Sequence, residues 1–489
     1  MTLSVTRRAL LSAAAACALA APHAAEAATA KNVMLFVSDG ASWGAWDMAS
    51  YWEYGEKGKQ PYDDFPVKLG MTTEPFGAPG YDPEAAWDTT PTGDGDYFAG
   101  YKTIKQNYTD SAAAGTALAT GRKTTNGRIS ADENGDPLPF LTQDMKDAGK
   151  ATGVVSSVPF SHATPAAFGA QNASRNNYGE IASQMINEGA LDLIMGGGNP
   201  EFGNSGEPRD PRFNRISEAD WNALNGPDAP MTLIQTKAEF DALADGSLDV
   251  DGRLIGLPQV GDTIQLSRDP AIVGTDPTTP SGRAFTDTVP SLKTMTEGAL
   301  NHLGEDEDGM FLMVEGGAVD WAAHGNATAG IIEEQVDFNH AVGAAVDWVE
   351  AHSSWDETLM IVLTDHGNAM PMGPDSDTIP FQPIQNNGAG ALPGVLWHYG
   401  THTTENTLMW ANGAGSETLY DMVIGEDPYL ASILGFNDGR YIDITGVNPA
   451  VRMAAGLDSA APIPLPAAGC MLLSGLAALA GARRLRRAA

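Results

Sequence analysis

Short apolar segments recur along the chain, and each ends at a turn-forming or charged residue. The first covers residues 31–38 (KNVMLFVS) and leads directly into Asp39-Gly40. An apolar run of this length that ends in a turn is typical of a strand buried on both faces. The same pattern predicts further strands at residues 153–157, 191–195, 310–314 and 359–364.

Helical patterns separate several of these strands, at residues 111–120, 291–303 and 331–352. Strands that alternate with helices predict the α/β class, with a central, largely parallel β-sheet flanked by helices on both faces. Two stretches lack this alternation. Residues 75–97 are rich in Gly, Pro and Asp, and residues 196–289 are polar with many turn signals. We interpret both as loops and insertions on a single domain that covers residues 28–455.

The first 27 residues have the features of an export signal. Arg7 and Arg8 provide a basic start, residues 9–21 are small and apolar, and Ala25-Glu26-Ala27 offers a cleavage site. The apolar run is too short to span a membrane. Thr6 to Leu11 also resembles a twin-arginine signal, so the export route stays open. We therefore expect a periplasmic, cell-surface or extracellular protein.

The C-terminal segment, residues 462–489, has a second targeting pattern. A proline-rich stretch precedes an apolar run at residues 467–482 and a cluster of arginines at residues 483–487. This order resembles the VPLPA-type sorting tails of the PEP-CTERM class, which implies recognition by a sorting enzyme at the membrane. The alternative is a marginal membrane anchor with positively charged flanking residues.

Charge and cysteine content narrow the classes of partner and chemistry. The net charge is −34, which makes nucleic acid and anionic lipid poor partners. An anionic substrate would need a local region of positive charge, which bound metals can supply. The two cysteines, Cys17 and Cys470, both lie in the terminal segments. A core disulfide and thiolate catalysis are therefore excluded for the domain between them.

Candidate metal ligands follow the predicted strands. Asp39 follows the first strand, Glu315 the fourth, and Asp365-His366 the fifth. Any one of these residues has a simpler explanation, because Asp often caps a helix and Asp-His-Gly is a plausible turn. Ligands in open α/β sheets nevertheless collect at the carboxyl ends of strands, so these positions can meet in one crevice.

The spacing of these residues favours metal binding. Asp320 and His324 are four residues apart, so both face the same way on a helix. With His402 they would complete a tetrahedral zinc site. Asp39, Asp365 and His366 would form a second mixed site. Thr164 and Glu315 offer only oxygen atoms, which suit magnesium better than zinc.

Ser111 begins a run of small residues that reads Asp110-Ser111-Ala-Ala-Ala-Gly-Thr-Ala. The run predicts a tightly packed helix with Ser111 in its first turn and Gly121 at its end. A phosphate at this helix start would meet free backbone N–H groups and the positive end of the helix dipole. The simpler alternative is that Asp110 or Ser111 only caps the helix.

Taken together, these residues resemble the alkaline phosphatase family, from about residue 31 to residue 411. The chain has the family's motifs in the family's order: Val37-Ser-Asp39-Gly, Asp110-Ser111-Ala-x-x-Gly-Thr-Ala, His162-Ala-Thr164-Pro-Ala with Asn172-x-x-Arg175, Glu315-Gly-Gly-x-x-Asp320-x-x-x-His324, Thr364-Asp365-His366-Gly and Thr401-His402-Thr-x-Glu405.

The resemblance implies hydrolysis of small phosphate monoesters through a phosphoserine intermediate, with two Zn²⁺ and one Mg²⁺ in each active site. It implies three ligand sets: Asp320, His324 and His402 for the first zinc; Asp39, Asp365 and His366, with Ser111, for the second; and Asp39, Thr164 and Glu315 for magnesium, with His162 in contact through water. Arg175 would clamp two phosphate oxygens. Asp110 and Trp321 would border the substrate. A homodimer is one assembly that this resemblance allows.

Two residues depart from the best-known bacterial members, which have Asp where this chain has His162 and Lys where it has Trp321. The His and Trp pair occurs in another branch of the family, so it bears on metal preference and phosphate affinity. A sulfatase is disfavoured, because three alanines follow Ser111 where a C/S-x-P-x-R motif would be needed. Two alternatives stay open: a phosphodiesterase of the same superfamily, with residues 196–289 as an extra binding wall, and a non-catalytic matrix protein.

Overall fold

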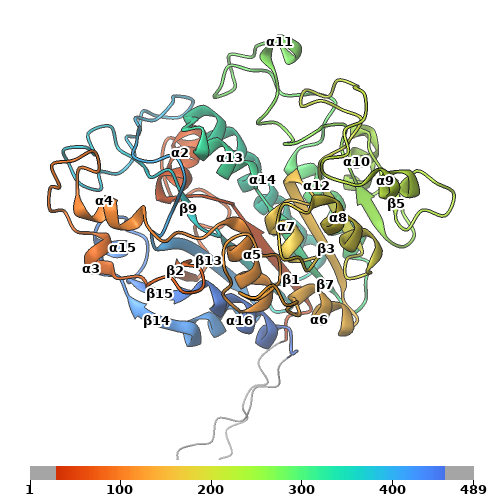
Figure 1. Ribbon diagram of the computed structural model, residues 1–489, viewed down its shortest axis with the longest axis horizontal. Helices are drawn as coiled ribbons and strands as arrows, with labels where there is room; N and C mark the ends of the chain where they lie inside the picture. The colour runs from red at the N-terminus through yellow and green to blue at the C-terminus, as the bar shows by residue number, and fades with distance from the viewer. Residues whose placement is uncertain (1–28, 458–489) are drawn as a thin grey trace, which may run out of the picture. The chain divides into compact units, whose positions relative to one another are not determined.

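A sheet of eleven strands forms the centre of the computed structural model, which describes residues 29–457 (Figure 1). The predicted signal peptide (residues 1–27) and sorting tail (residues 462–489) lie outside the described residues. In spatial order the strands are β14 (Val423–Glu426), β15 (Arg440–Asp443), β2 (Val67–Thr72), β13 (Thr407–Gly413), β8 (Thr358–Leu363), β1 (Asn32–Val37), β7 (Met310–Glu315), β3 (Ala151–Pro159), β4 (Leu193–Gly197), β6 (Leu254–Gly256) and β5 (Thr232–Ile234).

The strands from β8 through β1, β7, β3, β4 and β6 to β5 are all parallel. β13 runs antiparallel between β8 and β2, so its first residues lie at the edge of the sheet where β8 ends. The predicted fold class, a largely parallel sheet in an α/β protein, is therefore confirmed. The carboxyl ends of β1, β7 and β8 also meet at one edge, because Val37 pairs with both Glu315 and Leu363.

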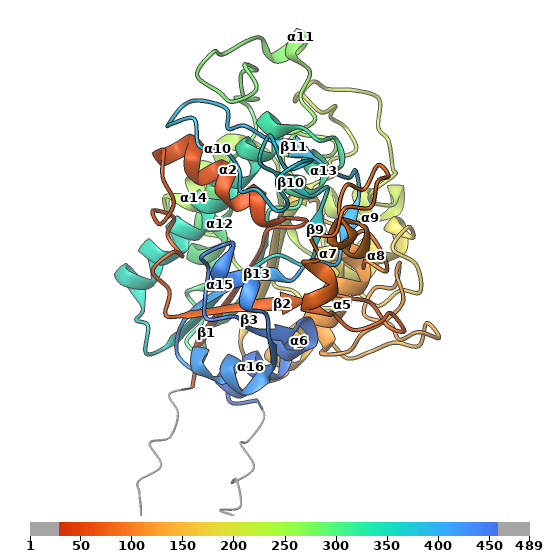
Figure 2. The same cartoon turned by 90° about the vertical axis from the view of Figure 1, so that its left-hand side faces the viewer.

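Helices lie on both sides of the sheet (Figures 1 and 2). Side chains of β1 alternate between two hydrophobic clusters, one on each face of the sheet. Met34 and Phe36 pack on one face, and Val33, Leu35 and Val37 pack on the other. The first cluster includes α2 (Trp43–Tyr54), α10 (Lys237–Ala244), α12 (Leu292–Leu303), α13 (Ala318–His324) and α14 (Thr328–His352). The second includes α5 (Ser111–Thr120), α6 (Leu141–Asp147), α7 (Ala163–Ala167), α8 (Tyr178–Asn187), α9 (Glu218–Leu224) and α16 (Val447–Ala454).

Residues 196–289, which we interpreted as loops and an insertion, also contribute two strands to the central sheet. β5 and β6 both belong to this segment, and they extend the sheet beyond β4. Each strand has only three residues, too few for an apolar run to stand out in the sequence. α11 (Pro270–Val273) lies in the irregular part of the segment, at the top of Figure 1. Residues 75–97 are mainly irregular, with the four-residue helix α3 (Pro83–Ala86).

The helix that begins at Ser111 follows its predicted bounds. Asp110 caps its start by accepting a hydrogen bond from the Ala113 amide, and Gly121 ends it in the left-handed conformation. The small residues let α5 pack closely against α7, where a side chain at Gly115 would meet Ala167 at 3.1 Å. Gly115 also lies against Thr164, whose Cα atom would be 3.4 Å from the same added side chain. Within residues 29–457, no helix is both long enough and apolar enough to cross a membrane.

Candidate active site

Four acidic or imidazole side chains lie at the carboxyl ends of three neighbouring strands. Asp39 follows β1, Glu315 is the last residue of β7, and Asp365-His366 follows β8. All four side chains are completely buried. The strand register therefore brings together in space residues that lie far apart in the chain, as expected for ligands in an open α/β sheet.

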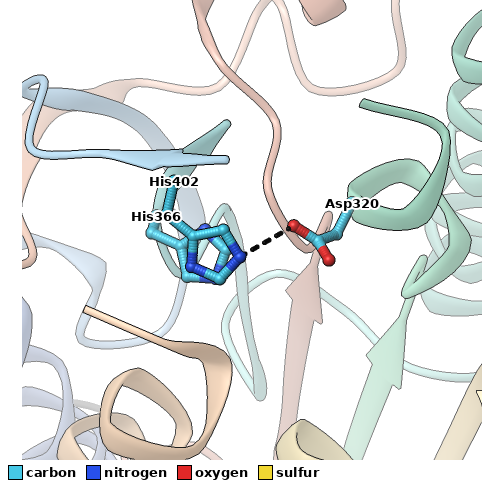
Figure 3. A group of neighbouring side chains, drawn as sticks. All are labelled: Asp320, His366 and His402. Carbon is cyan, nitrogen blue, oxygen red and sulfur yellow. Dashed lines mark ion pairs between the residues drawn. The ribbon is translucent and has the colours of Figure 1, made fainter. Parts of the chain in front are cut away.

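Asp320, His324 and His402 form the first group of side chains at this edge. Asp320 and His324 come from α13, whereas His402 comes from the short strand β12 (His402–Thr403), which pairs with β9 (Gly367–Asn368). The His324 Nε2 atom lies 3.4 Å from Asp320 Oδ2 and 3.1 Å from His402 Nε2. His402 Nε2 is 3.4 Å from Asp320 Oδ1 (Figure 3). These distances suit three ligands of one small cation.

His366 joins the first group to a second one. Its ring stacks on that of His402 at 3.8 Å between centroids (Figure 3). His366 Nε2 lies 3.4 Å from both Asp39 Oδ1 and Asp365 Oδ2, and 3.2 Å from Ser111 Oγ. Ser111 Oγ is also 3.5 Å from Asp39 Oδ1. The Ser111 hydroxyl therefore faces a second set of convergent ligand atoms.

A third group contains Asp39, His162 and Glu315, whose candidate ligand atoms all lie within 4.8 Å of one another. Thr164, in the first turn of α7, lies beside Glu315, and its hydroxyl only partly offsets the rise that burial causes in the pKa of that carboxyl. Ser156 donates a hydrogen bond to one of the two carboxylate oxygens of Glu315, Oε2. Asp39, Thr164 and Glu315 offer only oxygen atoms, which favours a hard cation such as magnesium.

Several buried polar atoms in these groups have no hydrogen-bond partner among residues 29–457: Asp39 Oδ2, His162 Nδ1, Thr164 Oγ1, Glu315 Oε1 and Asp365 Oδ2. Buried polar atoms are nearly always paired, and an unpaired buried charge is especially costly. Cations coordinated by these atoms would satisfy them. The donor set therefore fits the predicted metals.

Without cations, the site perturbs the pKa values of its own residues. Burial and the neighbouring Asp365 raise the pKa of Asp39 well above its usual range. Burial also raises the pKa of Glu315 to about 7 and that of Asp365 to about 6. The pKa of His366 is well below its ordinary value, again because of burial. This histidine is therefore neutral, the form that binds metals.

An open cavity of about 400 Å³ gives access to these groups, and its lining residues are Ser111, His162, Arg175, Asp320, Trp321, His324 and His402. Arg175 Nη1 donates a hydrogen bond to Asp110 Oδ2 at 2.9 Å, and Arg175 Nη2 lies 3.2 Å from His162 Nε2. The Trp321 ring packs edge-on against His162 at 5.5 Å. The buried serine and the guanidinium thus share one cavity with the first ligand group and with His162 of the third.

The structure brings all the predicted site residues together, and it adds others that the sequence did not indicate. Asn368 Nδ2 donates a hydrogen bond to Asp320 Oδ1 at 2.6 Å and so orients that carboxylate. Its only signal in the sequence is its position two residues after His366. Gln335 Oε1 accepts a hydrogen bond from Ser38, the residue before Asp39, at 2.7 Å. Glu405 belongs to a recognised motif, and it accepts hydrogen bonds from the Trp43 amide and the Thr403 hydroxyl.

Comparisons with family models and with known proteins point to the same family. The family model described as alkaline phosphatase matches residues 30–410. The chain is 30% identical over 370 residues to an alkaline phosphatase of Escherichia coli, which covers 70% of this chain and 74% of that protein. It is 35% identical over 266 residues to alkaline phosphatase 4 of Bacillus subtilis, covering 53% of this chain. That match spans only about half (49%) of the Bacillus protein.

Solved structures share the fold. The alkaline phosphatase of the Antarctic bacterium TAB5 superposes with a TM-score of 0.60 at 21% identity, and the match covers 88% of this chain and all of that one. Variants of that enzyme with a histidine replaced by glutamate or aspartate have Mg bound in a site designated M3.

We expect the chelated protein to lose stability as the pH rises, and Glu315→Gln to remove part of this loss. Because the folded pKa of Glu315 is about 7 and its ordinary value is 4.5, the folded state binds this proton more tightly than the unfolded chain. The resulting stabilisation is complete below about pH 4.5 and disappears as the pH rises to about 7. It amounts to about 3 kcal/mol. Denaturant unfolding of both chelated proteins across this range measures the difference.

The matched control is Glu350→Gln, which removes an exposed carboxylate from α14. Its unfolding free energy should follow that of the wild type at every pH. Parallel curves for the wild type and Glu315→Gln would contradict the assignment of an uncompensated buried carboxylate.

Proposed function

The chain belongs to the alkaline phosphatase family, and we propose that it hydrolyses phosphate monoesters through a phosphoserine formed at Ser111. The observation that carries this proposal is the position of the Ser111 hydroxyl, 3.2 Å from His366 Nε2 and in the same cavity as Arg175. A hydroxyl among convergent metal ligands, beside a guanidinium, suits attack on a phosphate group.

Three cations would be held by the three ligand groups. Asp320, His324 and His402 would bind one zinc ion, and Asp39, Asp365 and His366 would bind another, next to Ser111. Magnesium would be held by Asp39, Thr164 and Glu315, with His162 nearby. When bound, these cations lower the pKa of the serine hydroxyl and stabilise negative charge on the phosphoryl oxygens. The Mg bound in variants of the Antarctic enzyme supports a third site of this kind.

Ser111 would act as the nucleophile from the first turn of α5. Its Oγ atom forms a bond to phosphorus while the bond from phosphorus to the alcohol oxygen breaks, and the alcohol leaves. Water then attacks the phosphoserine, which releases inorganic phosphate and restores the hydroxyl. The start of α5 favours negative charge because its backbone N–H groups and helix dipole point toward the phosphate.

Arg175 would bind the phosphate oxygens. Although burial opposes it, the ion pair with Asp110 raises the pKa of Arg175, so the guanidinium stays charged. The same contact fixes Arg175 relative to Ser111, because Asp110 is also the N-cap residue of the Ser111 helix. Asp110 therefore couples the phosphate clamp to the nucleophile. This role would be that of a positioning residue.

The cavity favours monoesters over diesters. Among the described residues, those lining it belong to the phosphate site, and none comes from residues 196–289, the segment that would have to form an extra wall for a diester. Nothing in this lining is specific for one alcohol, so a broad range of monoesters is the expected substrate class. We further propose that the reaction takes place outside the cytoplasm, on the basis of the N-terminal and C-terminal targeting patterns in the sequence.

We expect the zinc- and magnesium-loaded protein to hydrolyse p-nitrophenyl phosphate at least about 100-fold faster than bis-p-nitrophenyl phosphate, since the diester has one anionic oxygen fewer for Arg175 and the cations to bind. Chelation should abolish the activity, and added zinc and magnesium should restore it. A thiol reductant is the matched control, and it should have no effect because both cysteines lie outside the catalytic domain. Preferred hydrolysis of the diester, or full activity after complete demetallation, would refute the proposal.

Phosphate affinity should rise when Trp321 is replaced by lysine. Trp321 supplies no charge to the cavity, and its neighbour His162 is neutral at alkaline pH because burial and Arg175 lower its pKa well below the usual value. A lysine side chain, after solvent screening, would contribute about 1 kcal/mol, or about fivefold in affinity. The measurement is the inhibition constant of inorganic phosphate at alkaline pH for Trp321→Lys.

Trp321→Met is the control for loss of the indole ring without gain of charge, and it should leave phosphate inhibition near that of the wild type. All three proteins must have the same metal content. Unchanged or weaker inhibition of Trp321→Lys would count against this account of Trp321.

A further inference from the structure

A second cavity, of about 410 Å³, lies on the flank of the domain. It is formed by α12, α14, the start of α10 and residues 285–289, and it shares no lining residue with the active-site cavity. Its volume is within the range of small-molecule sites. Phe285, Val289 and Val336 contribute apolar surface to its lining. An apolar body of modest size can therefore fit in it.

Two polar side chains that line this cavity are buried and unpaired. Glu334 is only 5% exposed, and its Oε1 atom has no hydrogen-bond partner within the described chain. Thr286 is 4% exposed, and the same holds for its Oγ1 atom. Such atoms destabilise the fold unless they are satisfied. Two of them in the lining of one cavity indicate a ligand that brings hydrogen-bond donors.

The other buried or partly buried charged groups around Glu334 already have partners, and the remaining charged residue of the lining, Asp287, is exposed to solvent. Asp337 accepts hydrogen bonds from the backbone amides at the start of α12, and Glu333 forms a buried ion pair with Arg268 at 2.7 Å. The basic residues of the lining are paired as well: Lys237 with Asp241, Lys293 with Glu297, and His340 with Glu53. The Glu334 carboxyl is therefore the group here that still requires a partner, and that partner should be positively charged.

A metal ion does not fit this cavity. In the part of the chain that the structure describes, the side chains that converge closely enough to hold a metal ion all belong to the active site. An organic ammonium group needs no such cage of oxygens, because a single carboxylate and one hydroxyl can accept its hydrogen bonds. We propose that this cavity binds a small molecule with one ammonium group, held by Glu334 and Thr286, on an apolar body.

The electrostatics of Glu334 agree with this assignment. Burial raises the pKa of Glu334 to about 8, and the negative charges of Asp337 and Glu333 add to the effect, which the guanidinium groups of Arg268 and Arg283 offset only in part. An ammonium group in the cavity would favour the ionised carboxylate. Glu334 would then gain a charge-assisted hydrogen bond that the protein alone does not provide.

The test uses 2-phenylethylamine as the probe, titrated calorimetrically into the metal-loaded enzyme at about pH 8.5 in an amine-free buffer. We expect saturable binding at one site. Its uncharged and anionic analogues, 2-phenylethanol and 3-phenylpropionate, should bind at least about tenfold more weakly, because neither supplies a cation to Glu334. Equal binding of the amine and the alcohol would overturn the proposal.

Two substitutions at Glu334 separate a ligand-binding role from a structural one. Glu334→Gln should weaken amine binding by about tenfold or more. Glu334→Leu should abolish binding, and without ligand it should raise the midpoint of thermal unfolding by about 1–2 °C, because it removes an unpaired buried carboxyl. Glu350→Gln, an exposed change on the same helix, should alter neither property.

Full amine binding by Glu334→Gln would show that the probe binds elsewhere, for example at the active-site metals, and would overturn the assignment. A lower unfolding midpoint for Glu334→Leu would show that the carboxyl supports the fold, and it would overturn the proposal as well.

Discussion

Mutual repulsion among buried carboxylates is the constraint on which the rest of this structure depends. Asp39, Glu315, Asp320 and Asp365 lie together with almost no contact with solvent. Charges this close and this poorly solvated are tolerated only when protons or cations neutralise them. The raised pKa values of Asp39, Glu315 and Asp365 show that ionising these carboxyl groups is unfavourable when no cation is bound. Divalent cations at the unpaired oxygens would remove that cost and supply the positive charge that an acidic protein needs to bind phosphate.

The parallel sheet is what makes such a concentration of charge possible. β1, β7 and β8 end at the same edge, so Asp39, Glu315 and Asp365 can converge although they are distant in sequence. The antiparallel pair β9 and β12 places His402 beside this edge. The Ser111 helix approaches it because alanine and glycine allow close packing against α7. The architecture thus presents a nucleophile to the ligand groups without needing a flexible loop.

The central strands and the helix of residues 111–120 were predictable because their signals are local: long apolar runs, an N-cap aspartate and a terminal glycine. Among the candidate metal ligands, Asp39, Glu315, Asp365 and His366 could be proposed because each follows a strand, and the others because their spacing fits a recognisable motif. The strands β5 and β6 were missed, since three residues carry no periodicity and only pairing with β4 makes them strands. Asn368 and Glu334 were missed for a related reason. Asn368 is distinguished by its hydrogen bond to Asp320, and Glu334 by its unpaired buried carboxyl. Both features exist only in the folded chain.

The most direct test of the central claim is to identify the residue that carries phosphate during turnover. The metal-loaded enzyme would be mixed with p-nitrophenyl phosphate between about pH 5 and 9, quenched rapidly in acid, digested and analysed by mass spectrometry. The account predicts covalent phosphate on the peptide that contains Ser111, and neither phosphate nor turnover in Ser111→Ala. Phosphate on a different residue, or near-normal turnover by a folded, metal-loaded Ser111→Ala protein, would contradict it.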